Sequence, residues 1–88
     1  MENLNKNTMM FLQLIGMFQQ ATMQHLGKIK NPVTDKIERN LQEAESTIEL
    51  LVMLKEKTKG NLSVEESRYF DFILQEVKLN FVEEKQKG

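Results

Sequence analysis

The sequence carries no charged side chain for 21 consecutive residues, from Asn7 to Gly27, although charged residues make up 28% of the chain. A stretch of this length could cross a bilayer. It also contains Gln13, Gln20 and further polar side chains, and each polar group left unpaired in hydrocarbon costs several kcal/mol. This cost exceeds the gain from inserting its apolar side chains, so we expect a helix covered by protein rather than a membrane span.

The spacing of the side chains in this stretch is typical of a packed helix. Positions three and four apart form a seam, which we predict from Phe11, Leu14, Phe18, Ala21 and His25. Further apolar side chains extend the seam onto the adjacent faces, and these are Met9, Met10, Leu12, Ile15, Gly16, Met17 and Met23. One neighbouring helix cannot cover such a helix. We therefore predict that it is the central helix of a bundle, covered by its own chain and by a second chain.

Two further helices are predicted in the charged remainder of the chain. Asn40 followed by Glu43, and Ser63 followed by Glu66, have the spacing of helix N-caps. The predicted elements of the single domain 1–88 are a tail over 1–7, a helix over 8–26, a connector over 27–40, a helix over 41–58 and a helix over 63–84. We expect the connector to place Ile29, Val33 or Ile37 against the core. The fold class is all-α, a three-helix bundle or a helical hairpin plus a third helix, completed by dimerisation.

Composition argues against several classes of function. A net charge of −1 with well-mixed signs gives no basic patch for nucleic acid. The absence of cysteine removes disulfides, thiolate metal sites and thiol nucleophiles, and it fits a reducing compartment. We expect no catalytic residue, no cofactor and no metal.

Two long segments resemble a known family. They are FLQLIGMFQQATMQHLGKIKNP and NLQEAESTIELLVMLKEKTKGNLSVEE. Together they are similar, over about residues 9–82, to the bacterial family called domain of unknown function 1844. The resemblance implies a compact intracellular helical protein and transfers no catalytic residue.

Three groups of residues could carry chemistry, and each also has a structural interpretation. His25 is the only histidine, and we interpret it as a helix-end residue hydrogen-bonded within the bundle. Glu45 and Glu49 have the spacing to bridge a divalent ion, but a solvated helix face is the better interpretation. Lys55, Lys57 and Lys59 precede a helix start and could form a weak anion site. We favour a turn whose charges complement the helix dipole.

We expect a non-catalytic cytoplasmic module that acts through helix packing and forms a homodimer. The predicted interface residues are Met9, Leu12, Gly16, Met17, Met23, Phe72 and Leu79. One alternative is a peripheral membrane or membrane-protein adaptor that uses the 8–26 helix. Another is a small-molecule or metal site near His25.

Overall fold

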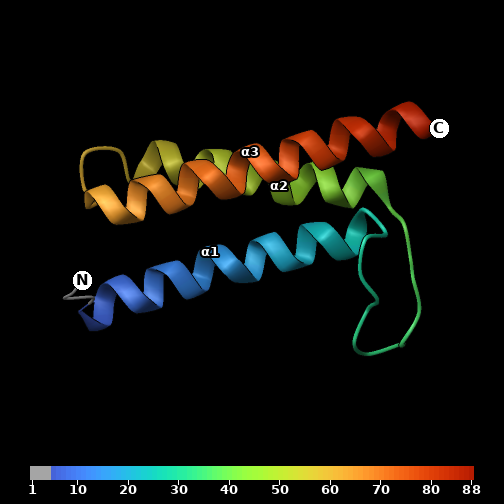
Figure 1. Ribbon diagram of the computed structural model, residues 1–88, viewed down its shortest axis with the longest axis horizontal. Helices are drawn as coiled ribbons and strands as arrows, with labels where there is room; N and C mark the ends of the chain where they lie inside the picture. The colour runs from blue at the N-terminus through green and yellow to red at the C-terminus, as the bar shows by residue number, and fades with distance from the viewer. Residues whose placement is uncertain (1–4) are drawn as a thin grey trace.

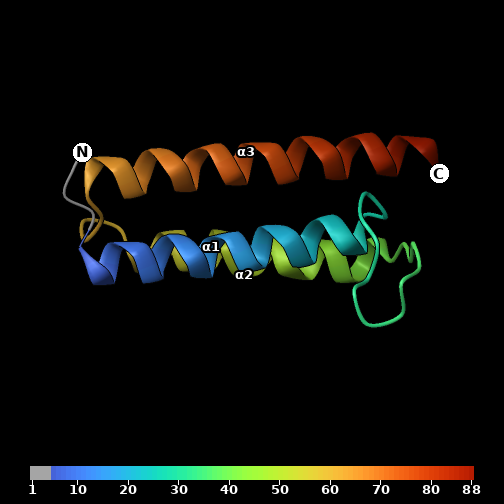
Figure 2. The same cartoon turned by 60° about the horizontal axis from the view of Figure 1, so that its bottom comes forward.

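The protein consists of three long helices packed side by side. A computed structural model describes residues 5–88, and its helices are α1 (Lys6–His25), α2 (Leu41–Lys57) and α3 (Val64–Lys87). Each helix contacts the other two; α1 and α3 run parallel, and α2 runs antiparallel to both (Figure 1 and Figure 2). Within residues 5–88 the only β-type pairing is two isolated bridges in the α1–α2 connector, so the predicted all-α class with three helices is confirmed.

Side-chain caps fix where α1 and α2 begin. The Asn5 side chain accepts a hydrogen bond from the Thr8 amide at 2.8 Å, so α1 starts at Lys6 and not at residue 8 as predicted. The predicted tail over 1–7 is thus wrong for residues 6 and 7, and its residues 1–4 lie outside the described part of the chain. Asn40 caps α2 in the same way, accepting from the Glu43 amide at 3.1 Å.

A capping box starts α3 and also joins it to α1. The Glu66 amide donates to the Ser63 hydroxyl, and the Ser63 amide donates to the Glu66 carboxylate at 2.8 Å. The Ser63 amide, and then the Thr8 hydroxyl of α1, lower the pKa of Glu66 from its ordinary value. Because α1 and α3 are parallel, both of their N-termini meet at this buried carboxylate.

Gly27 ends α1 at a backbone conformation that favours glycine. Its φ is 78°, its amide donates to the Gln24 carbonyl, and the Lys28 amide donates to the Met23 carbonyl at 2.9 Å. This pair of bonds is a Schellman motif. A Cβ on Gly27 would also lie 3.3 Å from the Cβ of Arg39, where the connector returns toward α2. The turn therefore needs glycine for both conformation and space.

The connector is held by Leu26 and not by the residues we expected. Leu26 is fully buried and pairs with Arg39 in an isolated β-bridge. Ile29 is only half-buried, Ile37 is exposed, and Val33 is 90% exposed. The prediction that Val33 could lie against the core was wrong. The Asn31 side chain accepts a hydrogen bond from the Val33 amide at 2.8 Å and so closes a local turn. This turn projects away from the bundle.

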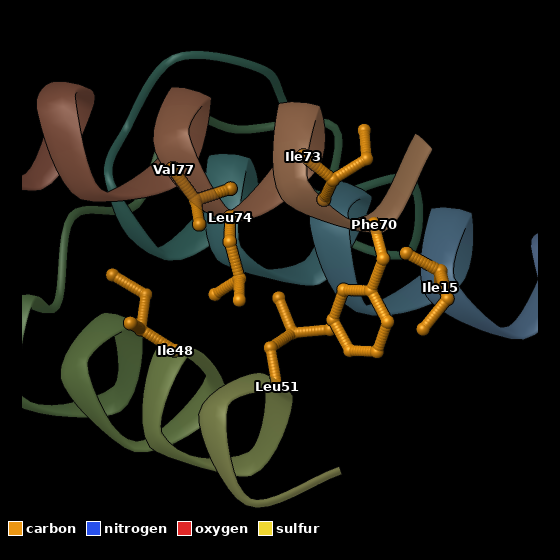
Figure 3. Packing of buried hydrophobic residues seen from close by; sticks show 7 residues of the cluster. All are labelled: Ile15, Ile48, Leu51, Phe70, Ile73, Leu74 and Val77. Carbon is orange, nitrogen blue, oxygen red and sulfur yellow. The ribbon is translucent and has the colours of Figure 1, made fainter. Parts of the chain in front are cut away.

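The core lies along the axis shared by the three helices. Its buried members are Ile15, Ile48, Leu51, Phe70, Ile73, Leu74 and Val77. Figure 3 shows Phe70, Leu74 and Val77 of α3 directed toward Ile48 and Leu51 of α2, with Ile15 of α1 beside Phe70. Phe11 packs edge-on against Phe70, with ring centroids 5.9 Å apart. The helical spacing of the large side chains in the third helix predicts one apolar stripe made of Phe70, Ile73, Leu74, Val77 and Phe81. The first four are buried, and Phe81 is partly buried against them.

The buried seam of α1 differs from the predicted one. Thr8, Ile15 and Thr22 are buried, with Phe11 and Phe18 packed beside them, whereas Leu14 is 38% exposed. The true seam is therefore rotated by about 60° from the predicted one, at 100° per residue. The error arose because threonine counts as polar in a hydrophobic pattern, although its hydroxyl can be satisfied within a helix.

Thr22 and Thr47 set the register of α1 against α2. Their hydroxyl oxygens are 2.7 Å apart, and each also lies near a carbonyl of its own helix, Thr22 near Phe18 and Thr47 near Ala44. Two hydroxyls have only two protons for these three contacts. One threonine therefore donates to its own helix, and the other donates across the interface.

Replacing Gly16 with alanine is expected to stabilise the protein. A Cβ at Gly16 would meet the Tyr69 hydroxyl at 3.6 Å, which is ordinary van der Waals contact. Because glycine inside a helix costs about 0.5–1 kcal/mol relative to alanine, Gly16→Ala should raise the free energy of unfolding by a similar amount. Urea unfolding should show a higher midpoint at an unchanged slope. A lower midpoint would mean that Tyr69 cannot accommodate the added methyl group.

Candidate functional site

The seven predicted interface residues lie on different sides of the bundle. Met9, Met17, Phe72 and Leu79 are exposed; Leu12, Gly16 and Met23 are half-buried, and Met23 packs against the core. Gly16 faces Tyr69 of α3, whereas Met17 lies 100° further around α1. Phe72 and Leu79 project from the side of α3 opposite to its buried residues. The structure therefore does not bring the seven together in one patch.

A different set of exposed apolar residues lies on one side of α1 and α2. We call it the α1–α2 face, and it consists of Met10, Leu14, Met17, Leu50 and Met53. On α1 the three members fall within an arc of about 60°, and the two on α2 fall within a similar arc. Helical spacing alone separates Leu50 and Met53 from the buried residues of α2, but no pattern within one helix pairs them with Met10 and Leu14.

Contacts to α3 show that both halves of this face point away from it. On α1, Gly16 faces Tyr69 and Gln19 donates to Glu76. The α1 members of the face lie about 100° or more around the helix from these two residues. On α2, Lys55 forms an ion pair with Asp71 of α3, and Leu50 and Met53 lie about 140–160° from Lys55.

The Thr22–Thr47 contact shows that the two halves are also level with each other. From that contact the antiparallel helices run in opposite directions, so residues before Thr22 lie beside residues after Thr47. Met17 is five residues before Thr22, and Leu50 and Met53 are three and six residues after Thr47. Met17 is therefore level with Leu50 and Met53 on the neighbouring helix, and Leu14 and Met10 extend the apolar surface along α1 toward its N-terminus.

A buried carboxylate at the connector end of the bundle collects three cations. The Glu84 side chain is 9% exposed, with Lys28 Nζ at 2.9 Å, Lys87 Nζ at 3.0 Å and Arg39 Nε at 3.4 Å. Arg39 also donates to the Glu84 carbonyl at 2.6 Å. Lys28 and then Lys87 lower the pKa of Glu84 to about 2, against an ordinary value of 4.5. The cluster joins the connector to the last turns of α3.

This cluster is a structural clasp, and it has no counterpart in the sequence predictions. Lys28 and Arg39 lie far from Glu84 in the sequence, so no local pattern brings them together. The clasp also gives a reason why α3 continues to Lys87, beyond its predicted end at residue 84: Lys87 of the last turn holds the Glu84 carboxylate. All of its charges are satisfied internally, which makes it an unsuitable place to bind a ligand.

The lysines predicted as a weak anion site are divided by the structure. Lys55 and Lys59 line a groove of about 300 Å³ between α2 and α3, together with Val52, Glu56, Leu74 and Lys78. Lys57 does not line it. Lys55 is already paired with Asp71, and Glu56 adds negative charge. Lys78 is a cation at this groove that sequence reasoning missed, because it lies on a different helix.

His25 lies beside an open polar hollow, not in the apolar seam that we predicted. The hollow has a volume of about 290 Å³, and its walls are Gln24, His25, Asn31, Glu38, Arg39, Asn40 and Glu43. Several of these groups are occupied elsewhere, since Arg39 holds Glu84 and Glu38 pairs with Asn31. Residues 5–88 contain no group of three or more histidine, cysteine or acidic side chains placed to hold a metal ion. Glu45 and Glu49 are exposed on α2.

These observations define a small three-helix protein with apolar side chains exposed on every helix and a clasp of charges at one end. No helix in the described part of the chain combines the length and the apolar character needed to cross a membrane. The profile of the family described as "Domain of unknown function (DUF1844)" matches residues 8–83. The chain belongs to this family, as its two long segments predicted. Comparisons with curated proteins and with solved structures gave no match.

Proposed function

We propose that the protein is a non-catalytic cytoplasmic module that acts through helix packing and associates with a second copy of itself. The observation that carries this proposal is the amount of apolar surface left outside the core. Large apolar side chains are exposed on all three helices, and the five of the α1–α2 face, which lie on neighbouring helices, are 38–63% exposed.

The energies favour covering this surface. Full burial of one such side chain contributes roughly 1.5–3 kcal/mol, so a few of them buried together offset the entropy of bringing two chains together. A domain of 88 residues has a small core of its own and gains proportionally more from a second copy. A two-fold dimer is the commonest arrangement that covers a self-complementary surface.

Light scattering after size-exclusion chromatography tests the proposal. The expected mass at micromolar concentration is about twice the 10.3 kDa of one chain. Dilution should shift the mass toward that of one chain, since association depends on concentration. A mass of one chain at every concentration would refute self-association. Pelleting the protein with vesicles would instead support the membrane-adaptor alternative.

A further inference from the structure

We infer that the second copy docks on the α1–α2 face, with its α2 antiparallel to the α2 already there. This inference rests on the proposed function and assigns a surface and an orientation to it. It places the contact at Met10, Leu14, Met17, Leu50 and Met53. Phe72 and Leu79 of α3, which the sequence analysis assigned to the interface, then lie outside it.

The first argument is that half of this face carries no charge. Its α1 half lies within the uncharged stretch from Asn7 to Gly27, so no ionised group there must lose water when another chain covers it. Met10, Met17 and Met53 are flexible and can pack against their own copies without fixed complementarity of shape. Both properties suit contact with an identical surface.

The outer face of α3 has no uncharged half of this kind. Phe72 and Leu79 are two helical turns apart, and Glu65, Arg68 and Glu83 lie within about 40° of one or the other on the same face. Covering Phe72 and Leu79 would therefore also cover charged groups. The α2 half of the α1–α2 face also carries charges, since Glu49 and Lys57 lie within about 40° of Leu50 or Met53. The difference between the two surfaces is the uncharged α1 half, where no ionised group must lose its water.

The second argument is the order of charges along α2. This order favours the α2 helix of a second copy as the partner and determines the direction in which that helix runs. Acidic residues precede Leu50 in this segment, and these are Glu43, Glu45 and Glu49. Basic residues follow Met53, and these are Lys55, Lys57 and Lys59, with Glu56 as the one acidic residue among them. Antiparallel pairing with a second α2 places the acidic half of each helix beside the basic half of the other. Parallel pairing would place like charges together.

Met53 marks the position of the two-fold axis. Glu49 and Lys57 are each four residues from Met53, one before it and one after it. With the axis at Met53, Glu49 of each chain comes opposite Lys57 of the other. Met17 is level with this point on α1, so the centre of the contact is apolar on both helices.

Cysteine cross-linking tests the surface, because the chain has no cysteine of its own. Met53→Cys places one thiol at the proposed axis, and Phe72→Cys, also with a single thiol, is the matched control on α3. Under mild copper-catalysed oxidation at micromolar concentration, Met53→Cys should form the disulfide-linked dimer at least about tenfold faster, because association holds its thiols together. Random collision would favour the control, since Phe72 is 62% exposed and Met53 is 45% exposed.

The outcomes separate this inference from the proposed function. A wild-type protein with the mass of one chain refutes both. A dimeric wild type in which Phe72→Cys cross-links faster overturns only the α1–α2 face. The double variant Phe72→Glu/Leu79→Glu provides a second control: it should remain dimeric, and its dissociation to single chains would also overturn the inference.

Charge reversal tests the antiparallel orientation. Glu49→Lys and Lys57→Glu, made separately, should each weaken self-association by roughly tenfold, because the two-fold axis turns both ion pairs into repulsive pairs. A mixture of the two variants should recover a dimer, since lysines on one chain then face glutamates on the other. With one of the two variants uniformly labelled with nitrogen-15, native mass spectrometry distinguishes this mixed dimer from both homodimers by mass. Single variants that associate as tightly as the wild type, or a mixture that stays dissociated, would overturn the orientation.

Discussion

Phe70→Ala is expected to lower the free energy of unfolding by about 3–5 kcal/mol. Phe70 is fully buried where all three helices meet, with its ring edge-on to Phe11 of α1 and beside Ile15 (Figure 3). Alanine would leave a cavity that helices fixed by caps at their starts cannot easily close. A small domain has only about 5–15 kcal/mol of stability in total, so this single change removes a large share of it. Urea unfolding followed by circular dichroism measures this loss.

Phe72→Ala is the matched control, because it removes the same atoms two residues further along α3. Phe72 is exposed, so its replacement should change the stability of the folded chain by no more than about 0.5 kcal/mol. Phe70→Leu, which removes less volume, should lie between the two and remain folded. Equal losses for the Phe70 and Phe72 alanine variants would contradict the helix orientation described here.

Lowering the pH from about 4.5 to about 2 is expected to destabilise the protein through the Glu84 clasp. The pKa of Glu84 is about 2 in the folded chain, against an ordinary value of 4.5. A depressed pKa means that the stability from this carboxylate is fully present above the ordinary value and is lost as the pH falls toward the folded value. Urea midpoints measured at one protein concentration across this range should therefore fall.

Glu84→Gln shows how much of that loss belongs to the clasp. The variant should be less stable than the wild type at neutral pH, because Lys28 and Arg39 lose their carboxylate partner. The difference should shrink toward pH 2, where Glu84 is itself becoming protonated. Glu83→Gln is the control, since Glu83 also meets Lys28 but is 60% exposed. A difference that stays constant with pH would mean that the clasp contributes nothing through its charge.

Glu66 adds to the acid sensitivity from the opposite end of the bundle. Its pKa is also lowered, by the Ser63 amide and the Thr8 hydroxyl, so its contribution follows the same sign as that of Glu84. Glu84→Gln should therefore reduce the loss of stability in acid without abolishing it. The two carboxylates lie at the two ends of α3, and each joins this helix to the rest of the chain.

Local features of the sequence determined the class of the fold and much of its detail. The N-caps at Asn40 and Ser63 were readable because a cap and its partner are only three residues apart. The apolar stripe of α3 was readable because its large side chains repeat cleanly at helical spacing. Phe72 and Leu79 were correctly separated from this stripe. Signals of this kind need no knowledge of neighbouring helices.

The face of α1 that is buried was decided only by tertiary structure. With apolar side chains around most of its circumference, α1 offered several possible seams, and the neighbouring helices chose the one containing Thr8, Ile15 and Thr22. The same packing left Leu14 exposed, on the side of α1 that turns away from α3. A pattern within one helix cannot specify its rotation when two other helices compete for it.

The clasp at Glu84 and the α1–α2 face also depend on the assembled bundle. Glu84 reaches Lys28 and Arg39 because parallel α1 and α3 bring the connector to the last turns of α3. The apolar face exists because antiparallel α1 and α2 place Met17 level with Leu50 and Met53. The sequence by itself determined three helices, two of them with their N-caps, and a surplus of apolar side chains. Tertiary structure decided where that surplus meets, because helix rotation and register are set by contacts between residues that are distant in the chain.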